Sequence, residues 1–126
     1  MLKQILIIGI GSFLGGASRH LLSYIIKNVS PSAFPLATLC INLLGCLAIG
    51  IFFGFFQRLG HSNSLLCLLL TTGFCGGFTT FSTFSNESLH LLSSGDYSYF
   101  AVYTITSIVV GILLVALGYY IVEIFS

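Results

Sequence analysis

Residues 73–87 read GFCGGFTTFSTFSNE, a polar and flexible stretch inside one of the most apolar parts of the chain. Two adjacent glycines are followed by two interleaved phenylalanines and by a set of hydroxyl side chains: Thr79, Thr80, Ser82, Thr83 and Ser85. Each glycine lowers helix propensity by about 1 kcal/mol. Serine and threonine can hydrogen-bond to backbone groups that a helix would otherwise pair. The stretch therefore predicts an interruption in a helical segment.

The composition around this stretch indicates a membrane protein. The 126 residues are 56% hydrophobic and 6% charged, with a mean hydropathy of +1.08, whereas a soluble domain has roughly a quarter of its residues charged. A spanning helix needs about 20 apolar residues. The apolar runs are continuous, not alternating, which favours helices over a β-barrel. We expect a single all-α domain covering residues 1–126, with four spans at about 4–26, 34–56, 65–92 and 99–125.

The positive charges do not select an orientation in the membrane. Four spans place both termini on one side, together with Lys3 and Arg58, and leave Arg19 and Lys27 for the other side. Orientation normally follows an excess of Lys and Arg on the cytoplasmic loops, and here the count is two against two. Two interpretations remain open: a weak bias still suffices, or the chain inserts both ways up and assembles as an antiparallel dimer.

The third apolar block is long enough to contain a break. Its length of about 28 residues corresponds to about 42 Å of straight helix, and the hydrocarbon core is about 30 Å thick. A broken helix leaves unpaired N–H and C=O groups, which are tolerated at membrane depth only inside protein or beside water. Discontinuous helices of this kind mark ion sites in membrane proteins. The alternative is a continuous Ser/Thr-rich helix that hydrogen-bonds to its neighbours.

Other spans contribute polar groups without formal charge. Asn42 lies about 10 Å along the second span from Pro35, and an amide at that depth is costly unless it is paired or hydrated. Tyr103 and Ser107 are one turn apart in the fourth span. Amides, hydroxyls and aromatic ring edges, which carry partial positive charge, suit a small anion. A cation pathway would require carboxylates or rings of carbonyl groups.

The chain resembles a known family, the Fluc-type fluoride channels, also called CrcB proteins. The resemblance covers essentially the whole chain and rests on GGASRH, PLATLCINLLG and GFCGGFTTFSTFSNE, of which the last is the most specific. The residues alone indicated an anion, and the resemblance specifies fluoride. The chain departs from the commoner pattern at His20, where an aromatic residue often stands, and at Ala37, where glycine is frequent.

The resemblance implies a passive, fluoride-selective channel that exports toxic fluoride through the plasma (inner) membrane of a microbial cell. It implies an antiparallel, dual-topology homodimer with two pores along the interface, and a sodium ion at the dimer centre. Backbone carbonyls of Gly76 and Thr79 would hold the sodium ion, and Gly76 is expected to adopt backbone angles that other residues resist. The implied pore residues are Phe81, Phe84, Asn42, Thr80, Ser82, Thr83, Tyr103 and Ser107, with Arg19 and Glu87 near the aqueous vestibules.

Other classes of protein fit less well. We expect no enzyme, because no nucleophile stands with a plausible base and no carboxylates are paired, and we expect no nucleic-acid partner. A four-span, dual-topology multidrug exporter needs a carboxylate in the membrane, typically in its first span, which here has none. A non-transporting scaffold subunit is the second alternative. The four cysteines form no CxxC pair, so we expect small packing residues and neither a metal site nor a disulfide.

Overall fold

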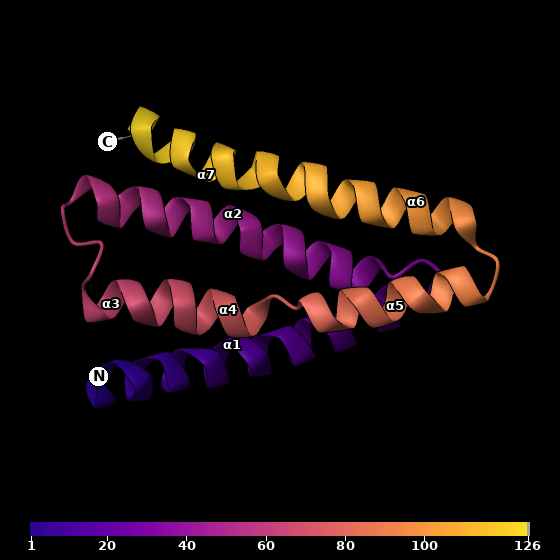
Figure 1. Ribbon diagram of the computed structural model, residues 1–126, viewed down its shortest axis with the longest axis horizontal. Helices are drawn as coiled ribbons and strands as arrows, with labels where there is room; N and C mark the ends of the chain where they lie inside the picture. The colour runs from indigo at the N-terminus through magenta and orange to yellow at the C-terminus, as the bar shows by residue number, and fades with distance from the viewer. Residues whose placement is uncertain (126) are drawn as a thin grey trace.

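The computed structural model describes residues 1–125, and within this range the chain is helical and contains no strand (Figure 1). The first apolar segment is helix α1 (Leu2–Val29) and the second is α2 (Leu36–Arg58). The third consists of α3 (Leu65–Leu68), the π-helix η1 (Leu69–Cys75), α4 (Gly76–Phe78) and α5 (Phe81–Ser93). The fourth consists of α6 (Tyr97–Ile105), the π-helix η2 (Thr106–Val110) and α7 (Gly111–Phe125).

Four segments are long and apolar enough to cross a membrane: Leu2–Val29, Leu36–Arg58, Leu65–Ser93 and Tyr97–Phe125. The prediction of an all-α protein with four spans is confirmed. Large apolar side chains are exposed along these segments, for example Phe13 at 74% and Ile112 at 66%. Lipid, not water, is the solvent that such a surface requires.

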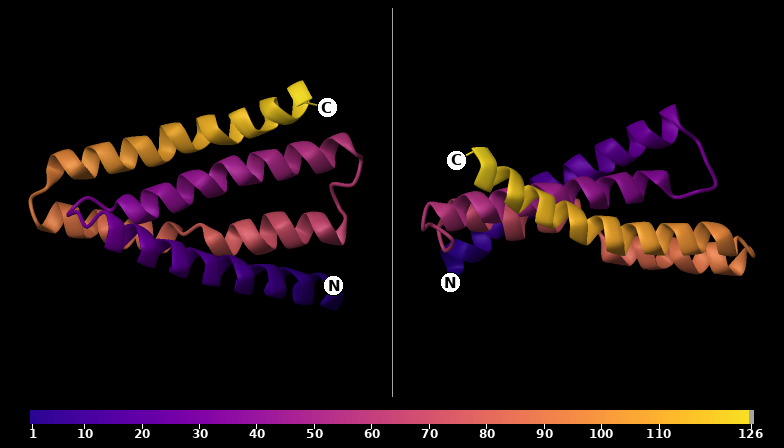
Figure 2. Two further views of the ribbon diagram at one scale, coloured as in Figure 1. Left: turned by 180° about the vertical axis from the view of Figure 1, so that it is seen from behind. Right: turned by 90° about the horizontal axis from the view of Figure 1, so that it is seen from above.

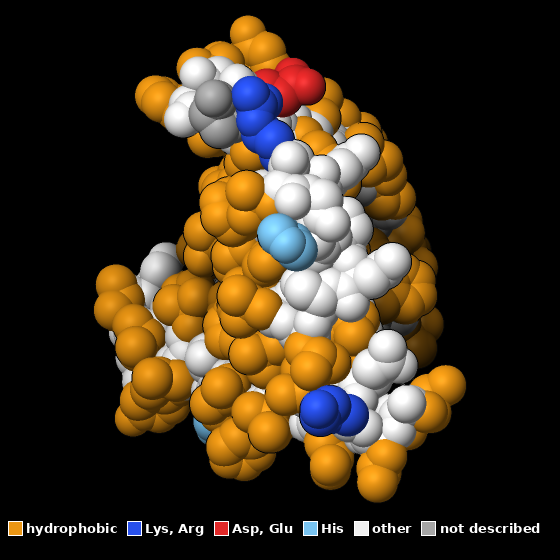
Figure 3. All heavy atoms as spheres, turned by 90° about the vertical axis from the view of Figure 1, so that its left-hand side faces the viewer, with side chains coloured by type: hydrophobic (Ala, Val, Ile, Leu, Met, Phe, Trp, Pro, Cys, Tyr) orange, Lys and Arg blue, Asp and Glu red, His pale blue; other side chains and the backbone are white. Residues whose placement is uncertain are grey.

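The four segments run back and forth, so that both termini and the loop after α2 lie at one end of the molecule (Figure 1). Figure 3 shows this end, where a few Lys, Arg, acidic and His side chains stand among hydrophobic ones. Lys3 lies in the first turn of α1 and Arg58 is the last residue of α2, whereas Lys27 lies in the last turn of α1, at the opposite end. Basic residues therefore occur at both ends.

Glycines allow the helices to approach closely. A Cβ atom added at Gly77 would lie 2.5 Å from the Ser12 backbone oxygen, and one at Gly118 would lie 2.7 Å from the backbone nitrogen of Ile51. Gly15 of α1 faces the carbonyl of Phe74 so closely that a Cβ atom would overlap it. In this way α1 packs against η1 and α4, and α2 packs against α7. Seen from above, the far end of α1 leans away from α5 and α6 (Figure 2).

The helical backbone of the third segment is interrupted at two threonines. Thr79 has φ −83° and ψ 161°, and Thr80 has φ −150° and ψ 122°, which are extended conformations. Gly76, by contrast, has φ −63° and ψ −37° and is helical. The expectation that Gly76 adopts glycine-only angles is therefore wrong. Glycine is needed one position later, where Gly77 makes room for the backbone of α1.

We predict that Gly15→Ala destabilises the protein by about 1–3 kcal/mol, because the added methyl group overlaps the Phe74 backbone and the helices must separate. Gly9→Ala is the matched control on the same helix. A Cβ atom there meets nothing within 4 Å, so stability should stay constant or rise by up to about 1 kcal/mol. Detergent-induced unfolding, followed by circular dichroism, measures both. Equal stability of the two variants would contradict the close-packing argument.

Candidate functional site

The side chain of Asn42 pairs with the interrupted backbone. Its Nδ2 donates to the Thr80 carbonyl oxygen at 3.0 Å, and its Oδ1 accepts from the Thr80 N–H at 2.8 Å. One residue of α2 therefore satisfies both backbone groups of an extended residue inside an apolar segment. Such groups are costly without a partner. The same two hydrogen bonds also give the Asn42 amide the partners that a polar side chain in an apolar segment requires.

The hydroxyl groups of the stretch pair with nearby backbone. Thr79 Oγ1 donates to the Cys75 carbonyl at 2.9 Å. Thr80 Oγ1 accepts from the Thr83 N–H at 3.2 Å and thereby caps α5. It also donates to Thr83 Oγ1 at 3.1 Å. The Ser/Thr-rich composition thus stabilises an interrupted backbone, as local side-chain bonds can.

Because of these hydrogen bonds, the carbonyl groups of Gly76 and Thr79 lose the N–H donors that they would have in a continuous helix. In a continuous helix, Gly76 C=O would accept from the Thr80 N–H and Thr79 C=O from the Thr83 N–H. The Thr80 N–H instead donates to Asn42, and the Thr83 N–H donates to the Thr80 hydroxyl. Both carbonyl groups belong to residues that line one cavity.

This central cavity has a volume of about 350 Å³ and lies between α2, the interrupted segment and η2. It is lined by Asn42, Gly45, Cys46, Ile49, Cys75, Gly76, Thr79, Thr80, Phe81, Phe84, Ser107 and Ile108. None of these lining residues carries a formal charge. Ser107 Oγ is buried and has no hydrogen-bond partner within residues 1–125. The cavity thus combines amide, hydroxyl and aromatic groups, the set that the sequence predicted for a small anion.

The two phenylalanines of the stretch differ in their surroundings. Their ring centroids lie 5.8 Å apart, with an interplanar angle of 39°. Phe84 is partly buried and packs on Tyr103 at 4.9 Å. The side chain of Phe81 is 79% exposed and extends from the single chain. A largely exposed aromatic ring beside a cavity is available to a further partner.

Three of the predicted pore residues do not line the central cavity. Tyr103 is fully buried behind Phe84, and its hydroxyl group donates to Glu87 Oε1 at 3.3 Å. Ser82 is exposed at the start of α5. Thr83 lines a smaller cavity of about 150 Å³. The family resemblance implied that these hydroxyls form one track, whereas the structure pairs Tyr103 with Glu87 and places Thr83 at a separate cavity.

The smaller cavity lies beside the interruption and contains basic side chains. It is lined by Arg19, His20, Ser23, Lys27, Thr38, Ile41, Thr80 and Thr83. Thr80 lines both this cavity and the central one. The Arg19 Nε atom is buried without a hydrogen-bond partner in the described part of the chain. Sequence reasoning did not place Ser23 here; the signal available was its position one turn after Arg19 on α1.

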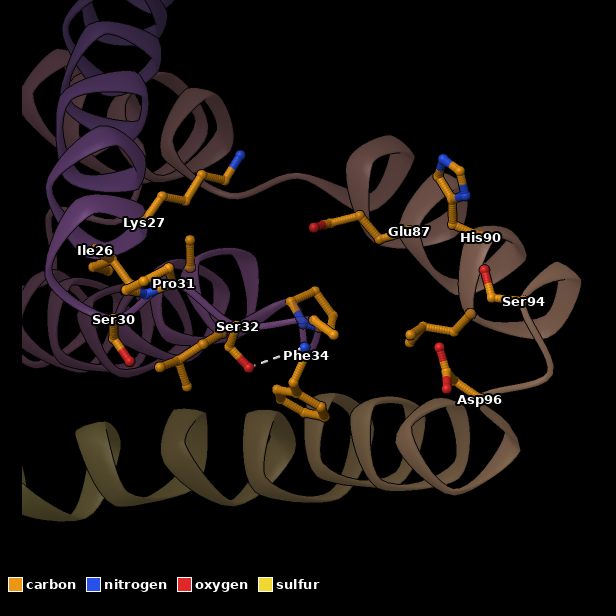
Figure 4. A pocket seen from close by; sticks show the side chains of 15 residues that line it. Ile26, Lys27, Ser30, Pro31, Ser32, Phe34, Glu87, His90, Ser94 and Asp96 are labelled. Atoms are coloured by element: carbon orange, nitrogen blue, oxygen red, sulfur yellow. Dashed lines mark hydrogen bonds between the residues drawn. The ribbon is translucent and has the colours of Figure 1, made fainter.

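A third, larger cavity of about 510 Å³ lies where α1 diverges from α5. Figure 4 shows Lys27 and Glu87 extending into this space from opposite sides, with His90 and Asp96 farther along the α5 side. Charged side chains therefore stand at the end of the bundle. Glu87 also accepts the Tyr103 hydroxyl, which links this mouth to the aromatic cluster beside the central cavity.

The four candidate spans and the uncharged internal cavity define a multi-pass membrane protein. Residues 6–119 match the model of a family described as CrcB-like protein, Camphor Resistance (CrcB). The chain belongs to the CrcB family.

Curated relatives carry the name fluoride-specific ion channel FluC. One from Phocaeicola vulgatus is 49% identical over 117 residues, which cover 93% of this chain and 96% of the relative. One from Azobacteroides pseudotrichonymphae is 40% identical over 125 residues, covering 99% of this chain and 100% of the relative. A third, from Bacteroides fragilis, is 43% identical over 128 residues with the same coverage. The family resemblance drawn from the sequence motifs is thus confirmed.

We predict that Asn42→Ala speeds hydrogen exchange at the Thr80 amide, because that variant leaves the Thr80 N–H without its acceptor. Each buried backbone group left unpaired should also cost about 1–3 kcal/mol of stability. Asn42→Asp is the matched control: it keeps the acceptor for the Thr80 N–H and loses the donor to the Thr80 carbonyl. Exchange at Thr80, measured by NMR, should therefore be slower in Asn42→Asp than in Asn42→Ala. The same exchange rate in the wild type and Asn42→Ala would rule out the pairing.

Proposed function

We propose that this chain is a fluoride-selective channel through which fluoride leaves the cell down its electrochemical gradient, conferring fluoride resistance. The observation that carries the proposal is similarity, along nearly the whole chain, to proteins named fluoride-specific ion channels. A protein of this class is a transporter and not an enzyme. Passive export suffices, because HF enters by diffusion and dissociates in the more neutral cytoplasm, and the negative interior then drives the anion outward.

The chemistry of the central cavity supports an anion that binds and leaves quickly. The Ser107 hydroxyl can donate to the ion, and the edges of Phe81 and Phe84 carry partial positive charge. A full positive charge in the cavity would hold fluoride too tightly, since conduction requires that binding be weak enough for release. The charged residues Arg19, Lys27 and Glu87 line the two other cavities, where they can attract or sort ions before entry.

A second copy of the chain, inserted the opposite way up, would complete this site. The exposed ring of Phe81 and the exposed Gly76 border the cavity and give the partner a contact surface. Basic residues at both ends of the bundle are compatible with insertion in both orientations. We assign the dimer to the plasma (inner) membrane of a microbe, where fluoride must be exported.

A sodium ion at the centre of this dimer fits the backbone. The Gly76 and Thr79 carbonyls have lost their helical donors to Asn42 and Thr80. A Cβ atom at Gly76 would meet only one atom, the Thr71 oxygen at 4.0 Å, so the surroundings of this backbone are open. Two carbonyls from each of two chains make four oxygen ligands, a set suited to a hard monovalent cation. When bound, sodium would supply fixed positive charge between the two pores.

Fluoride efflux from liposomes that contain only this protein tests the proposed function. We expect fluoride to leave and chloride to be retained. Neither a multidrug exporter nor a scaffold subunit would carry fluoride. The absence of efflux from well-folded protein would refute the channel.

We predict that Phe81→Ile and Phe84→Ile each lower fluoride efflux at least tenfold, because an aliphatic side chain presents no ring edge to the anion. The structure separates this effect from misfolding. Phe81 is 79% exposed in the single chain, so its replacement should leave the stability of the subunit unchanged, whereas Phe84 packs on Tyr103 and its loss should cost about 1 kcal/mol. Efflux and unfolding are measured on the same preparations. Wild-type efflux from both variants would remove the two rings from the pore.

We predict that replacing Na⁺ on both sides with a large organic cation reduces fluoride efflux, and that restoring Na⁺ recovers it. The physical reason is that the carbonyl oxygens repel one another without the ion between them. Potassium is the control for general ionic effects, since its larger radius fits a tight four-oxygen site less well. Efflux that is indifferent to complete removal of Na⁺ would falsify this site.

We predict that the orientation of the chain can be fixed by adding lysines to one end. Two variants biased in opposite directions should each be inactive alone and active together, because each lacks its inverted partner. Growth of a fluoride-sensitive host on fluoride reports the outcome. Full activity from one biased variant alone would exclude the antiparallel dimer.

A further inference from the structure

Two of the four cysteines line the central cavity from opposite elements. Cys46 lies on α2 and Cys75 is the last residue of η1. Cys75 is 2% exposed and Cys46 is partly buried. The other two cysteines, Cys40 and Cys67, are not among the residues that line this cavity. The sequence separates Cys46 and Cys75 by 29 positions, so no spacing motif predicts that they line one cavity.

The two thiols stand at the same depth in the bundle. Asn42 pairs with Thr80, and α2 and the interrupted segment run in opposite directions (Figure 1). Cys46 lies one turn beyond Asn42 on α2. Cys75 lies one turn before Thr79, whose N–H and hydroxyl both donate to the Cys75 carbonyl at 3.0 and 2.9 Å. One turn in each direction from a shared contact brings the two cysteines to the same level in the wall of one cavity.

We propose that Cys46 and Cys75 form a two-coordinate binding site for a thiophilic divalent cation, with Hg²⁺ as the probe, in the wall of the central cavity. Each thiol releases its proton to water and each thiolate forms one bond to the metal, with no change of oxidation state. The resulting complex is neutral, because two thiolates balance the charge of one divalent cation. A neutral complex is the form that an apolar wall tolerates.

The same considerations exclude other metals. Structural zinc takes four ligands, and within residues 1–125 no group of three or more His, Cys, Asp or Glu side chains could hold an ion. A monovalent soft cation between two thiolates would leave a net negative charge in the apolar wall, which is costly. Linear coordination by two sulfur atoms is the preferred geometry of Hg²⁺, so this ion fits the ligand count and the charge together.

Occupation of the site should also block the cavity. Its lining includes Asn42, Phe81 and Ser107 in the same space of about 350 Å³. A metal ion held between the thiols would draw α2 and η1 together and obstruct that space. This consequence rests on the proposed channel function, whereas binding of the metal does not.

The test compares matched variants of the full-length chain purified in detergent. Cys40→Ser/Cys67→Ser keeps only the proposed pair and should bind one Hg²⁺ per chain, measured by sulfur-to-mercury charge-transfer absorbance and by intact mass. In that background, Cys46→Ser or Cys75→Ser leaves a single thiol and should weaken binding by roughly 100-fold or more, since the chelate is lost. Cys75→Ala is a second choice if the buried hydroxyl of the serine variant impairs folding.

The outcomes decide the proposal. No binding by Cys40→Ser/Cys67→Ser, or equally tight binding after removal of either remaining thiol, overturns the two-coordinate site. In liposomes, Hg²⁺ should inhibit Cys40→Ser/Cys67→Ser and not Cys46→Ser/Cys75→Ser, each relative to its own untreated efflux, and a dithiol should reverse the inhibition. Tight paired binding without any fluoride efflux in untreated liposomes would reject the channel and retain the metal site.

Discussion

The two hydrogen bonds between Asn42 and Thr80 are the constraint on which the central part of this structure depends. An apolar environment offers no partner to a backbone that leaves the helical pattern. A single amide supplies both a donor and an acceptor, so one side chain can satisfy the N–H and the C=O of one extended residue. The Thr80 hydroxyl then starts α5 by accepting from Thr83. The interruption can persist because its polar groups have partners.

The same pairing determines what remains unpaired. Diverting the Thr80 and Thr83 N–H groups withdraws the helical donors of Gly76 and Thr79. The interruption thus leaves two backbone carbonyl groups without their helical donors, and both belong to residues that line a cavity. Cation sites built from backbone oxygens need such groups, and they are obtained here without any buried carboxylate. This arrangement keeps the central cavity uncharged.

Close helix packing fixes the position of the interruption. Gly15 and Gly77 let α1 approach η1 and α4 until backbone contacts backbone, and the π-helical turns of η1 change the register of the segment just before it. The same α1 then diverges from α5, which leaves the mouth with Lys27 and Glu87. The groups that line the central cavity are therefore uncharged, whereas the cavity where α1 diverges from α5 contains charged side chains.

The sequence by itself determined the class of the protein, the four spans, the family and most residues of the central cavity, because hydropathy, helix-breaking residues and a specific motif are local properties of the chain. Only the tertiary structure decided which partner each polar group has. Asn42 was predicted as a pore amide, but its pairing with Thr80 depends on how α2 lies against the third segment. Tyr103 was placed in a polar track and lies buried against Phe84. Cys46 and Cys75 were expected to be packing residues, and both line the central cavity because antiparallel segments bring distant positions to the same depth. Contacts between helices depend on their rotation and separation, and residue spacing along one helix does not specify either.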